Sequence, residues 1–220
     1  MRLKTIVLTI DDAPSKHTPE KIKYCVKNQI SADLFCRGEH LAKYTKEAIY
    51  AIQQGFLLGN HSMTHPYFSH KSLSVCQKEI SDTEHLIGQC YQAAGCTRSK
   101  KIIRMPFGDR GAGPAGRLAS HEKEKKHVSD IQTYLSTHNF VKPTYATHDS
   151  YIDVQWDLDT QDYKKKHIID PDMYLAHLDK ILTEYPHEKG ILLLHDFDHN
   201  HHLFEITCEH LKQCGVTYAS

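Results

Sequence analysis

The stretch KTIVLTIDD, residues 4–12, places a run of apolar and β-branched residues directly before two adjacent carboxylates. The same order recurs near the other end of the chain, where GILLLH, residues 190–195, ends an apolar run on a histidine. Runs that are apolar at successive positions are typical of strands covered by helices on both faces of a sheet. The two stretches therefore predict a parallel sheet with polar residues at the carboxyl ends of its strands.

Apolar runs of this kind alternate with helix-period segments along the whole chain. They predict strands at 4–10, 32–36, 56–59, 101–104, 141–146, 152–156, 190–194 and 216–219. Helix signals between them are Thr18-Pro19, a capping box from Ser74 to Gln77, and stops at Gly55 and Gly95. Seven or eight βα units in one domain spanning 1–220 predict an α/β fold, a distorted (β/α) barrel. No G-x-G-x-x-G follows a strand, so a dinucleotide-binding sheet lacks its signature.

Composition narrows the classes of partner. The 27 basic residues match the 27 acidic ones, so no global field attracts nucleic acid or an anionic membrane. The seven cysteines are odd in number and form no C-x-x-C, which predicts reduced thiols. No run approaches the roughly 20 apolar residues of a membrane span, and the amino terminus lacks a signal-peptide pattern. We therefore expect a cytoplasmic protein, with an exported protein whose leader was removed as the alternative.

Polar clusters follow five of the apolar runs in a fixed order. They are Asp11-Asp12, His61-x3-His65, Arg104-x-Pro106-Phe107, Asp159-x2-Asp162 and His195-Asp196. In a parallel barrel the carboxyl ends of the strands meet at one rim, where active sites are built.

Each cluster alone also fits an ordinary structural role. An Asp pair after a strand most often caps a turn, and with 18 histidines chance alone produces about one or two His pairs four residues apart. A histidine at a buried strand end, such as His195, most often makes only a structural hydrogen bond. Arg104 can likewise form a surface ion pair. The order and strand-end placement of all five clusters favour a metal hydrolase over five coincidences.

The chemistry expected of these residue types agrees. His61 and His65 on one helical turn can share a metal ion. Arg104 at an inward position needs an anionic partner, such as Asp11, and would keep that carboxylate ionised. His195 at a strand end can donate a proton to a leaving group.

The motifs resemble those of the polysaccharide deacetylases with NodB homology, carbohydrate esterase family four. They stand here as Thr9-Ile10-Asp11-Asp12-Ala13-Pro14, His61-Ser62-Met63-Thr64-His65, Arg104-Met105-Pro106-Phe107, Asp159-Thr160-Gln161-Asp162-Tyr163 and Leu193-Leu194-His195. The resemblance implies a hydrolase of non-peptide carbon–nitrogen bonds that removes an N-acetyl group from an N-acetylated sugar. Alternatives are an N-formyl sugar or another small amide as substrate, and a degenerate barrel that binds glycans without hydrolysis.

The resemblance also implies a role for each motif residue. Asp12, His61 and His65 are expected to bind a divalent metal, with zinc first and cobalt or another ion as alternatives. Asp11 is expected to be the base that activates water, oriented by Arg104, and His195 the acid, tuned by Asp162. Substrate and oxyanion contacts are expected from Phe107, Pro106, Trp156 and Leu193.

Three residues depart from the family pattern. Ala13 stands in place of glycine, Tyr163 in place of tryptophan and Ile10 in place of phenylalanine. If position 13 needs a positive φ, alanine costs about 1 kcal/mol there or the turn takes another shape. None of the three removes a reacting group, so the departures predict a different pocket wall.

Overall fold

The computed structural model describes residues 3–146 and 149–219. Within them, six strands form one sheet in the order β3-β2-β1-β5-β4, with β6 paired to β1. Every pairing is parallel, as expected for βα units. The α/β class is thereby confirmed. The strands are β1 (Thr5–Ala13), β2 (Ala32–Cys36), β3 (Leu57–Asn60), β4 (Leu158–Asp159), β5 (Lys189–His195) and β6 (Thr217–Tyr218).

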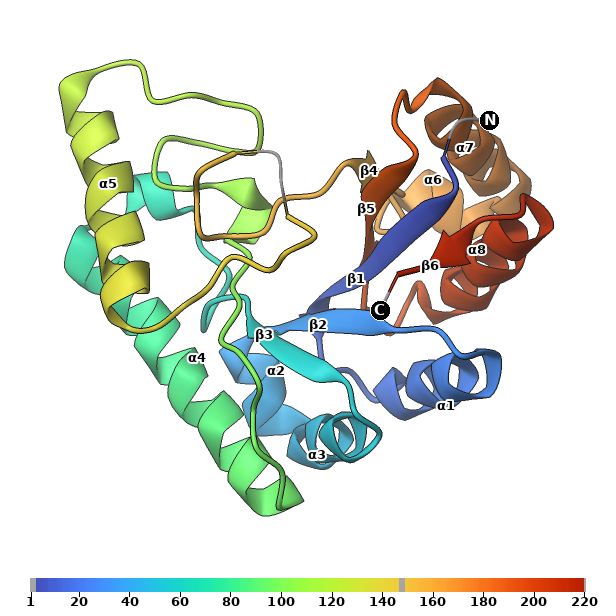
Figure 1. Cartoon of the computed structure of the whole chain (residues 1–220), viewed down its shortest axis with the longest axis horizontal. Coiled ribbons are helices and arrows are strands. Elements are labelled where there is room, and N and C mark those ends of the chain that lie inside the picture. Colours follow the sequence, from blue (N-terminus) through green and yellow to red (C-terminus); the bar gives the residue numbers. More distant parts are fainter. Residues whose placement is uncertain (1–2, 147–148, 220) are drawn as a thin grey trace.

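Helices surround the sheet on its outer side (Figure 1). They are α1 (Thr18–Asn28), α2 (Gly38–Lys43), α3 (Thr45–Gln53), α4 (Leu73–Ala94), α5 (Glu122–Thr137), α6 (Lys165–Ile169), α7 (Pro171–Glu184) and α8 (His201–Gln213), with 3₁₀ turns η1 (Phe68–His70) and η2 (Pro106–Gly108).

The helix signals are mostly confirmed. Pro19 lies in the first turn of α1, but the N-cap of that helix is His17, so the expected cap at Thr18 is wrong by one residue. Gly95 caps α4 in the left-handed conformation at φ 67°. Gly55 follows the end of α3 at φ 89°. The expected capping box at Ser74 is wrong by two residues, because the hydroxyl of Ser72 is the acceptor for the Val75 amide.

The centre of the sheet joins the two ends of the sequence. Strands β1 and β5 pair in register from Thr5 opposite Lys189 to Asp11 opposite His195. Their apolar side chains enter the core: Ile6, Leu8, Leu192 and Leu194 are at most 1% exposed. Each such burial contributes about 1.5–3 kcal/mol. The packed core fixes the register and so places Asp11 beside His195.

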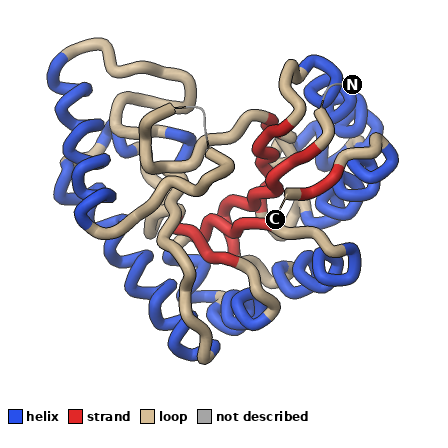
Figure 2. Tube along the Cα trace, viewed as in Figure 1, coloured by secondary structure: helices blue, strands red, loops and turns tan. Residues whose placement is uncertain are grey.

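Three expected strands are absent from the described sheet. Residues 101–104, 141–146 and 152–156 form loops, which lie between the strands and α5 (Figure 2). Only isolated bridges join Ile103 to Asn60 and Lys101 to Phe140. Single backbone hydrogen bonds still join these segments to their neighbours and close this side of the barrel. They run from Val154 N to Ile103 O and from Asp157 N to Ile191 O. The barrel is distorted at this side.

The side chain of Arg104 explains part of this distortion. Its Nε donates to the carbonyl of Val154 at 3.1 Å and its Nη2 to that of Gln155 at 3.2 Å. A side chain thus occupies acceptors that a neighbouring strand would otherwise use. An apolar sequence pattern does not record such a replacement, which is why strands were predicted here.

No helix among the described residues is long and apolar enough to cross a bilayer.

Candidate active site

A cavity of about 370 Å³ opens at the carboxyl ends of β1, β3 and β5. Its wall contains eight of the eleven residues expected to act in catalysis, metal binding or substrate contact, and the other three, Arg104, Pro106 and Asp162, lie outside its lining. The lining consists of Asp11, Asp12, His61, His65, Tyr67, Phe107, Pro114, Ala115, Trp156, Asp159, Tyr163, Leu193, His195 and Phe197.

Asp11 and Asp12 reach the same cavity although they are neighbours in one strand. In a regular strand, successive side chains point to opposite faces. Here the register against β2 shifts between Ile10 and Ala13, and Asp12 takes a φ of 59°. This irregularity works as a bulge that turns the second carboxylate toward the first.

Asp11 is held by a fully buried guanidinium. Arg104 Nη1 lies 2.7 Å from Asp11 Oδ1 and also donates to the hydroxyl of Thr9 at 2.9 Å. Burial raises the pKa of Asp11, but the charges of Arg104, His61 and His195 outweigh it and bring that pKa below its ordinary value. Asp11 is therefore a carboxylate at neutral pH, as a base must be.

Asp12, His61 and His65 form a group suited to a metal ion. Their ligand atoms lie within 4.8 Å of one another. The Nδ1 of His61 donates to the carbonyl of Arg104 at 2.8 Å, which leaves the lone pair of Nε2 for the cavity. The Oδ1 of Asp12 is buried without a hydrogen-bond partner. A buried carboxylate oxygen of that kind is costly unless a cation completes it.

The second histidine is kept neutral. Burial, the neighbouring His61 and the guanidinium of Arg37 lower the pKa of His65 to about 4, against the opposing charge of Asp12. Its Nε2 lies 3.7 Å from Asp12 Oδ1. One carboxylate oxygen and two imidazole nitrogens, with open space beyond them, fit a zinc-type ion with an exchangeable position.

His195 is paired with Asp162. Its Nδ1 donates to Asp162 Oδ1 at 2.7 Å, and its backbone amide donates to Oδ2 at 2.8 Å. The side-chain amide of Asn200 supports the same carboxylate at 2.9 Å. Burial lowers the pKa of His195, but Asp162, Asp11 and Asp12 outweigh it and raise the pKa to about 9. The imidazole is therefore charged at neutral pH and can give up a proton.

Aromatic side chains form the outer wall. Phe107, 39% exposed, stacks on Tyr67 with ring centroids 3.9 Å apart and contacts the edge of His65 at 4.4 Å. The ring of Tyr163 packs edge-on against that of His195, with ring centroids 5.0 Å apart. The ring of Phe197 stacks on the same His195 ring, with centroids 5.5 Å apart. Trp156 and Leu193 line the cavity, whereas Pro106 is buried and does not line it, and their contacts with a substrate stay a prediction.

Sequence reasoning missed three members of this site. Tyr67 and Phe197 had no signal beyond being aromatic residues close to the motifs. Arg37 follows β2, and its Nη1 lies 3.6 Å from Asp12 Oδ1. Its position directly after an apolar strand is the same signal that identified Arg104.

Asp196, adjacent to His195, is a structural residue. It is 2% exposed and accepts from Lys21 Nζ at 2.7 Å and from the Ser15 amide at 2.9 Å. The hydroxyl of Thr18 donates to it at 2.5 Å. This network attaches the start of α1 to the end of β5 and so fixes the strand end that carries His195.

The alanine at position 13 carries no strain of the kind considered above. The described non-glycine residues with positive φ include Asp12 but not Ala13. Ala13 is fully buried, and its carbonyl accepts from the amide of Arg37 at 3.0 Å. The turn therefore has the other shape, with its left-handed residue at Asp12.

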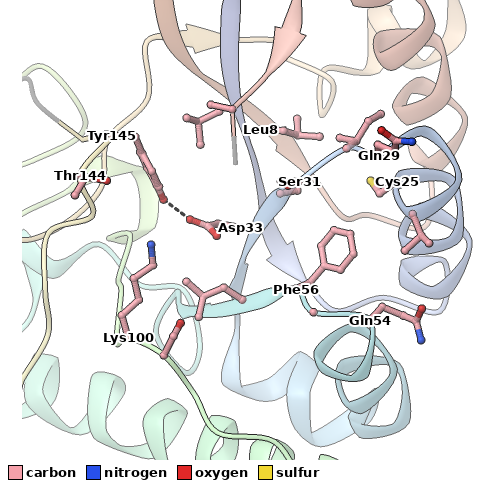
Figure 3. A pocket seen from close by; sticks show the side chains of 18 residues that line it. Leu8, Cys25, Gln29, Ser31, Asp33, Gln54, Phe56, Lys100, Thr144 and Tyr145 are labelled. Atoms are coloured by element: carbon pink, nitrogen blue, oxygen red, sulfur yellow. Dashed lines mark hydrogen bonds between the residues drawn. The ribbon is translucent and has the colours of Figure 1, made fainter.

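A larger cavity, of about 570 Å³, lies at the amino-terminal ends of the strands (Figure 3). Its polar wall includes Asp33, which accepts from the hydroxyl of Tyr145, and Lys100. None of the residues of the five clusters lines it. The residues of the five clusters therefore gather at the smaller of these two cavities.

Comparison with known proteins identifies relatives of this chain. A family model described as polysaccharide deacetylase matches residues 1–146. A peptidoglycan-N-acetylmuramic acid deacetylase of Bacillus subtilis is 33% identical over 106 residues, which are 48% of this chain and 22% of the relative. The chain spans less than half of the length of three of the curated relatives that it matches.

Solved structures share the fold. A family 4 carbohydrate esterase from Streptomyces lividans, in complex with acetate, aligns with a TM-score of 0.67 at 18% identity, over 99% of this chain and 92% of that one. A CE4 family pseudoenzyme from Bacillus anthracis aligns with a TM-score of 0.67 at 17% identity, over 98% of this chain and 63% of the other.

Proposed function

Because the chain belongs to the polysaccharide deacetylase family, we propose that it removes the N-acetyl group from an N-acetylated carbohydrate by hydrolysis. The named activity of its relatives on peptidoglycan and chitooligosaccharide supports this substrate class. The aromatic wall of Phe107, Tyr67 and Trp156 supports it too, because aromatic faces pack well against sugar rings.

One observation carries the proposal: two charged pairs of opposite function meet in one cavity. Asp11 is kept ionised by Arg104, and His195 is kept protonated by Asp162. Titratable groups whose pKa values are pushed apart are the signature of an acid and a base working on one reaction. A module that only binds glycans needs neither pair.

The residues divide the reaction between them. Asp11 takes a proton from the water that attacks the amide carbonyl, and Arg104 holds the carboxylate in position. As the carbon–nitrogen bond breaks, His195 gives its proton to the departing amine nitrogen. The products are acetate and a free amino sugar. The backbone N–H of Phe107 is proposed as a donor to the oxygen that becomes negative at the carbonyl.

Asp12, His61 and His65 would hold a divalent cation, with zinc as the proposed ion. Such a cation supplies Lewis acidity at the carbonyl and lowers the pKa of the attacking water. The orphaned Oδ1 of Asp12 and the orientation of His61 support its binding.

A barrel without catalysis is the second candidate, because a CE4 pseudoenzyme shares the fold at comparable similarity. The complete acid and base pairs argue against it. The cytoplasmic location expected from the sequence stays a prediction.

A release screen tests the proposal. The purified chain is incubated with N-acetyl and N-formyl sugars and oligosaccharides, with zinc, with cobalt and after chelation, and acetate and formate are measured. We expect acetate release that chelation abolishes, and Asp11→Asn to lose turnover while keeping its metal. Formate release alone would move the substrate to formyl sugars. Undiminished activity in metal-free protein would refute the mechanism, and no release from any substrate would favour the binding module.

A further inference from the structure

A second group of metal-ligand side chains lies outside the barrel, between α7 and α8, which run next to each other in Figure 1. Asp179 comes from α7, His210 from the last turn of α8, and Cys214 from its C-cap. Their ligand atoms lie within 4.8 Å of one another. We propose that Asp179, His210 and Cys214 form a second, zinc-type metal site that joins the two helices.

The local geometry brings the donors to one point. His210 and Cys214 are four residues apart, so one helical turn places them on the same face of α8. The Nε2 of His210 lies 3.7 Å from Cys214 Sγ and 2.8 Å from Asp179 Oδ1. A single ring nitrogen thus faces both other donors.

These distances can be compared with those around a tetrahedral ion. Zinc bonds of about 2.0–2.1 Å to nitrogen and oxygen and about 2.3 Å to sulfur put nitrogen about 3.6 Å from sulfur and about 3.3 Å from oxygen. The nitrogen–sulfur distance already fits. The nitrogen–oxygen distance must open by about half an ångström, which is within reach of a carboxylate 62% exposed at its side chain.

The helices provide a rigid frame for the site. Tyr174 and Leu178 of α7 pack with Leu203 of α8, and all three are fully buried. The hydroxyls of Tyr174 and Thr207 are hydrogen-bonded at 2.6 Å between the same helices. The backbone therefore does not have to move to bring the ligands together.

The chemistry of the donors points to a borderline-soft divalent cation. A thiolate, an imidazole and a carboxylate, with water in the fourth position, form a set that zinc accepts and that calcium and magnesium do not favour. Without the ion, His210 Nε2–H donates to Asp179. Binding replaces that hydrogen, moves the ring proton to Nδ1 and releases the thiol proton of Cys214 to solvent.

The simpler alternative is a helix-to-helix hydrogen bond beside a free thiol. Cys214 is a free, partly buried cysteine, and the side chain of His210 is 14% exposed. An ion from solvent can therefore reach both side chains. An experiment specific for the sulfur ligand separates the two.

Cobalt titration of the full chain, first stripped of metal, provides that experiment. Thiolate-to-cobalt charge transfer absorbs in the near ultraviolet, and the Asp12, His61 and His65 group contains no sulfur. We expect this absorption to saturate with one thiolate-bound cobalt per chain and to disappear when zinc is added. It should persist in His61→Ala/His65→Ala, where the first site is removed, so the outcome is independent of the proposed deacetylase activity.

Variants assign the ligands. Cys214→Ser should abolish the absorption, and His210→Ala should weaken cobalt binding at least about tenfold. Cys96→Ser is the matched control, because Cys96 is an exposed free cysteine outside the site. In the His61→Ala/His65→Ala background, zinc at a hundredfold excess over its Kd should raise Tm by about 5–10 °C, and this rise should vanish with Cys214→Ser.

Two results would overturn the second site. One is the absence of thiolate absorption in folded protein at saturating cobalt. The other is absorption that survives Cys214→Ser, which would assign the thiolate ligand to another cysteine. If Cys214→Ser does not fold by circular dichroism, Asp179→Asn decides by its loss of cobalt affinity, because the side chain of Asp179 is 62% exposed.

Discussion

Replacing Asp162 by asparagine tests whether a charge pair keeps His195 protonated. In the structure, burial lowers the pKa of His195, and the charge and hydrogen bond of Asp162 are the leading influences that raise it to about 9. An acid acts only while it holds its proton. Activity that depends on His195 is therefore present below about pH 9 and is lost as the pH rises through that value.

The size of the effect follows from the pKa. Without Asp162, burial opposes the imidazolium and only the smaller contributions of Asp11 and Asp12 favour it, so we expect the pKa of His195 to fall to about its ordinary value of 6.5. At pH 7.5 the protonated fraction then drops from about 97% to about 9%, a loss of about tenfold in kcat/KM. The same change corresponds to about 3 kcal/mol of lost preference for the charged form.

The assay is kcat/KM against pH between about pH 5 and 10, combined with an NMR titration of the His195 ring. We expect the basic limb to move from about pH 9 to about 6.5 in Asp162→Asn, with activity partly recovered at low pH. Asp198→Asn is the control, because Asp198 is an exposed carboxylate three residues after His195. Its basic limb should stay near pH 9.

A basic limb unchanged in Asp162→Asn would refute this account of the acid. A uniform loss at every pH would mean that Asp162 orients His195 without setting its charge. Because Asn200 also donates to Asp162, circular dichroism must establish that the variant is folded.

Three further predictions concern the base, the metal and the turn. Arg104→Met leaves the carboxylate of Asp11 buried without its partner and should cost about 3–5 kcal/mol in the free energy of unfolding by urea at pH 7, where a loss below about 1 kcal/mol would contradict the ion pair's role. Asp12→Asn should weaken zinc binding at least about tenfold in competition with a chelating dye, whereas Asp11→Asn should keep it; equal losses would contradict the separation of base and ligand. Ala13→Gly should leave kcat/KM within about twofold and lower the free energy of unfolding by about 0.5–1 kcal/mol, because position 13 has no positive φ, and a gain in activity would refute this.

The gathering of the site could be predicted from the sequence because parallel strands impose it. Residues after apolar runs arrive at one edge of the sheet whatever their separation in the chain. Asp11 and His195, 184 residues apart, end strands that pair in register. Two runs of apolar residues thus carried most of the positional information.

The distorted side of the barrel could not be predicted in the same way. The pattern around 152–156 is strand-like, yet its carbonyls are acceptors for Arg104 instead of a neighbouring ladder. Tyr67 lies in a loop, and its stacking on Phe107 depends on how two loops meet. A side chain that takes the place of a strand as hydrogen-bond partner, and a contact between two loops, both depend on the tertiary structure. Local sequence patterns do not encode either of them.

The motifs also contain most of the non-glycine residues with a left-handed backbone conformation in the described part of the chain. Among the described non-glycine residues, seven have positive φ, and five of them stand within the motifs: Asp12, Ser62, His65, Phe107 and Gln161. The left-handed conformation costs about 1–2 kcal/mol for an ordinary residue, and residues held there concentrate at functional sites. At Asp12, glycine would carry no such cost, but it would remove the buried Oδ1 that has no hydrogen-bond partner. The aspartate at position 12 is therefore explained by its carboxylate and not by its backbone, and that is the property expected of a ligand.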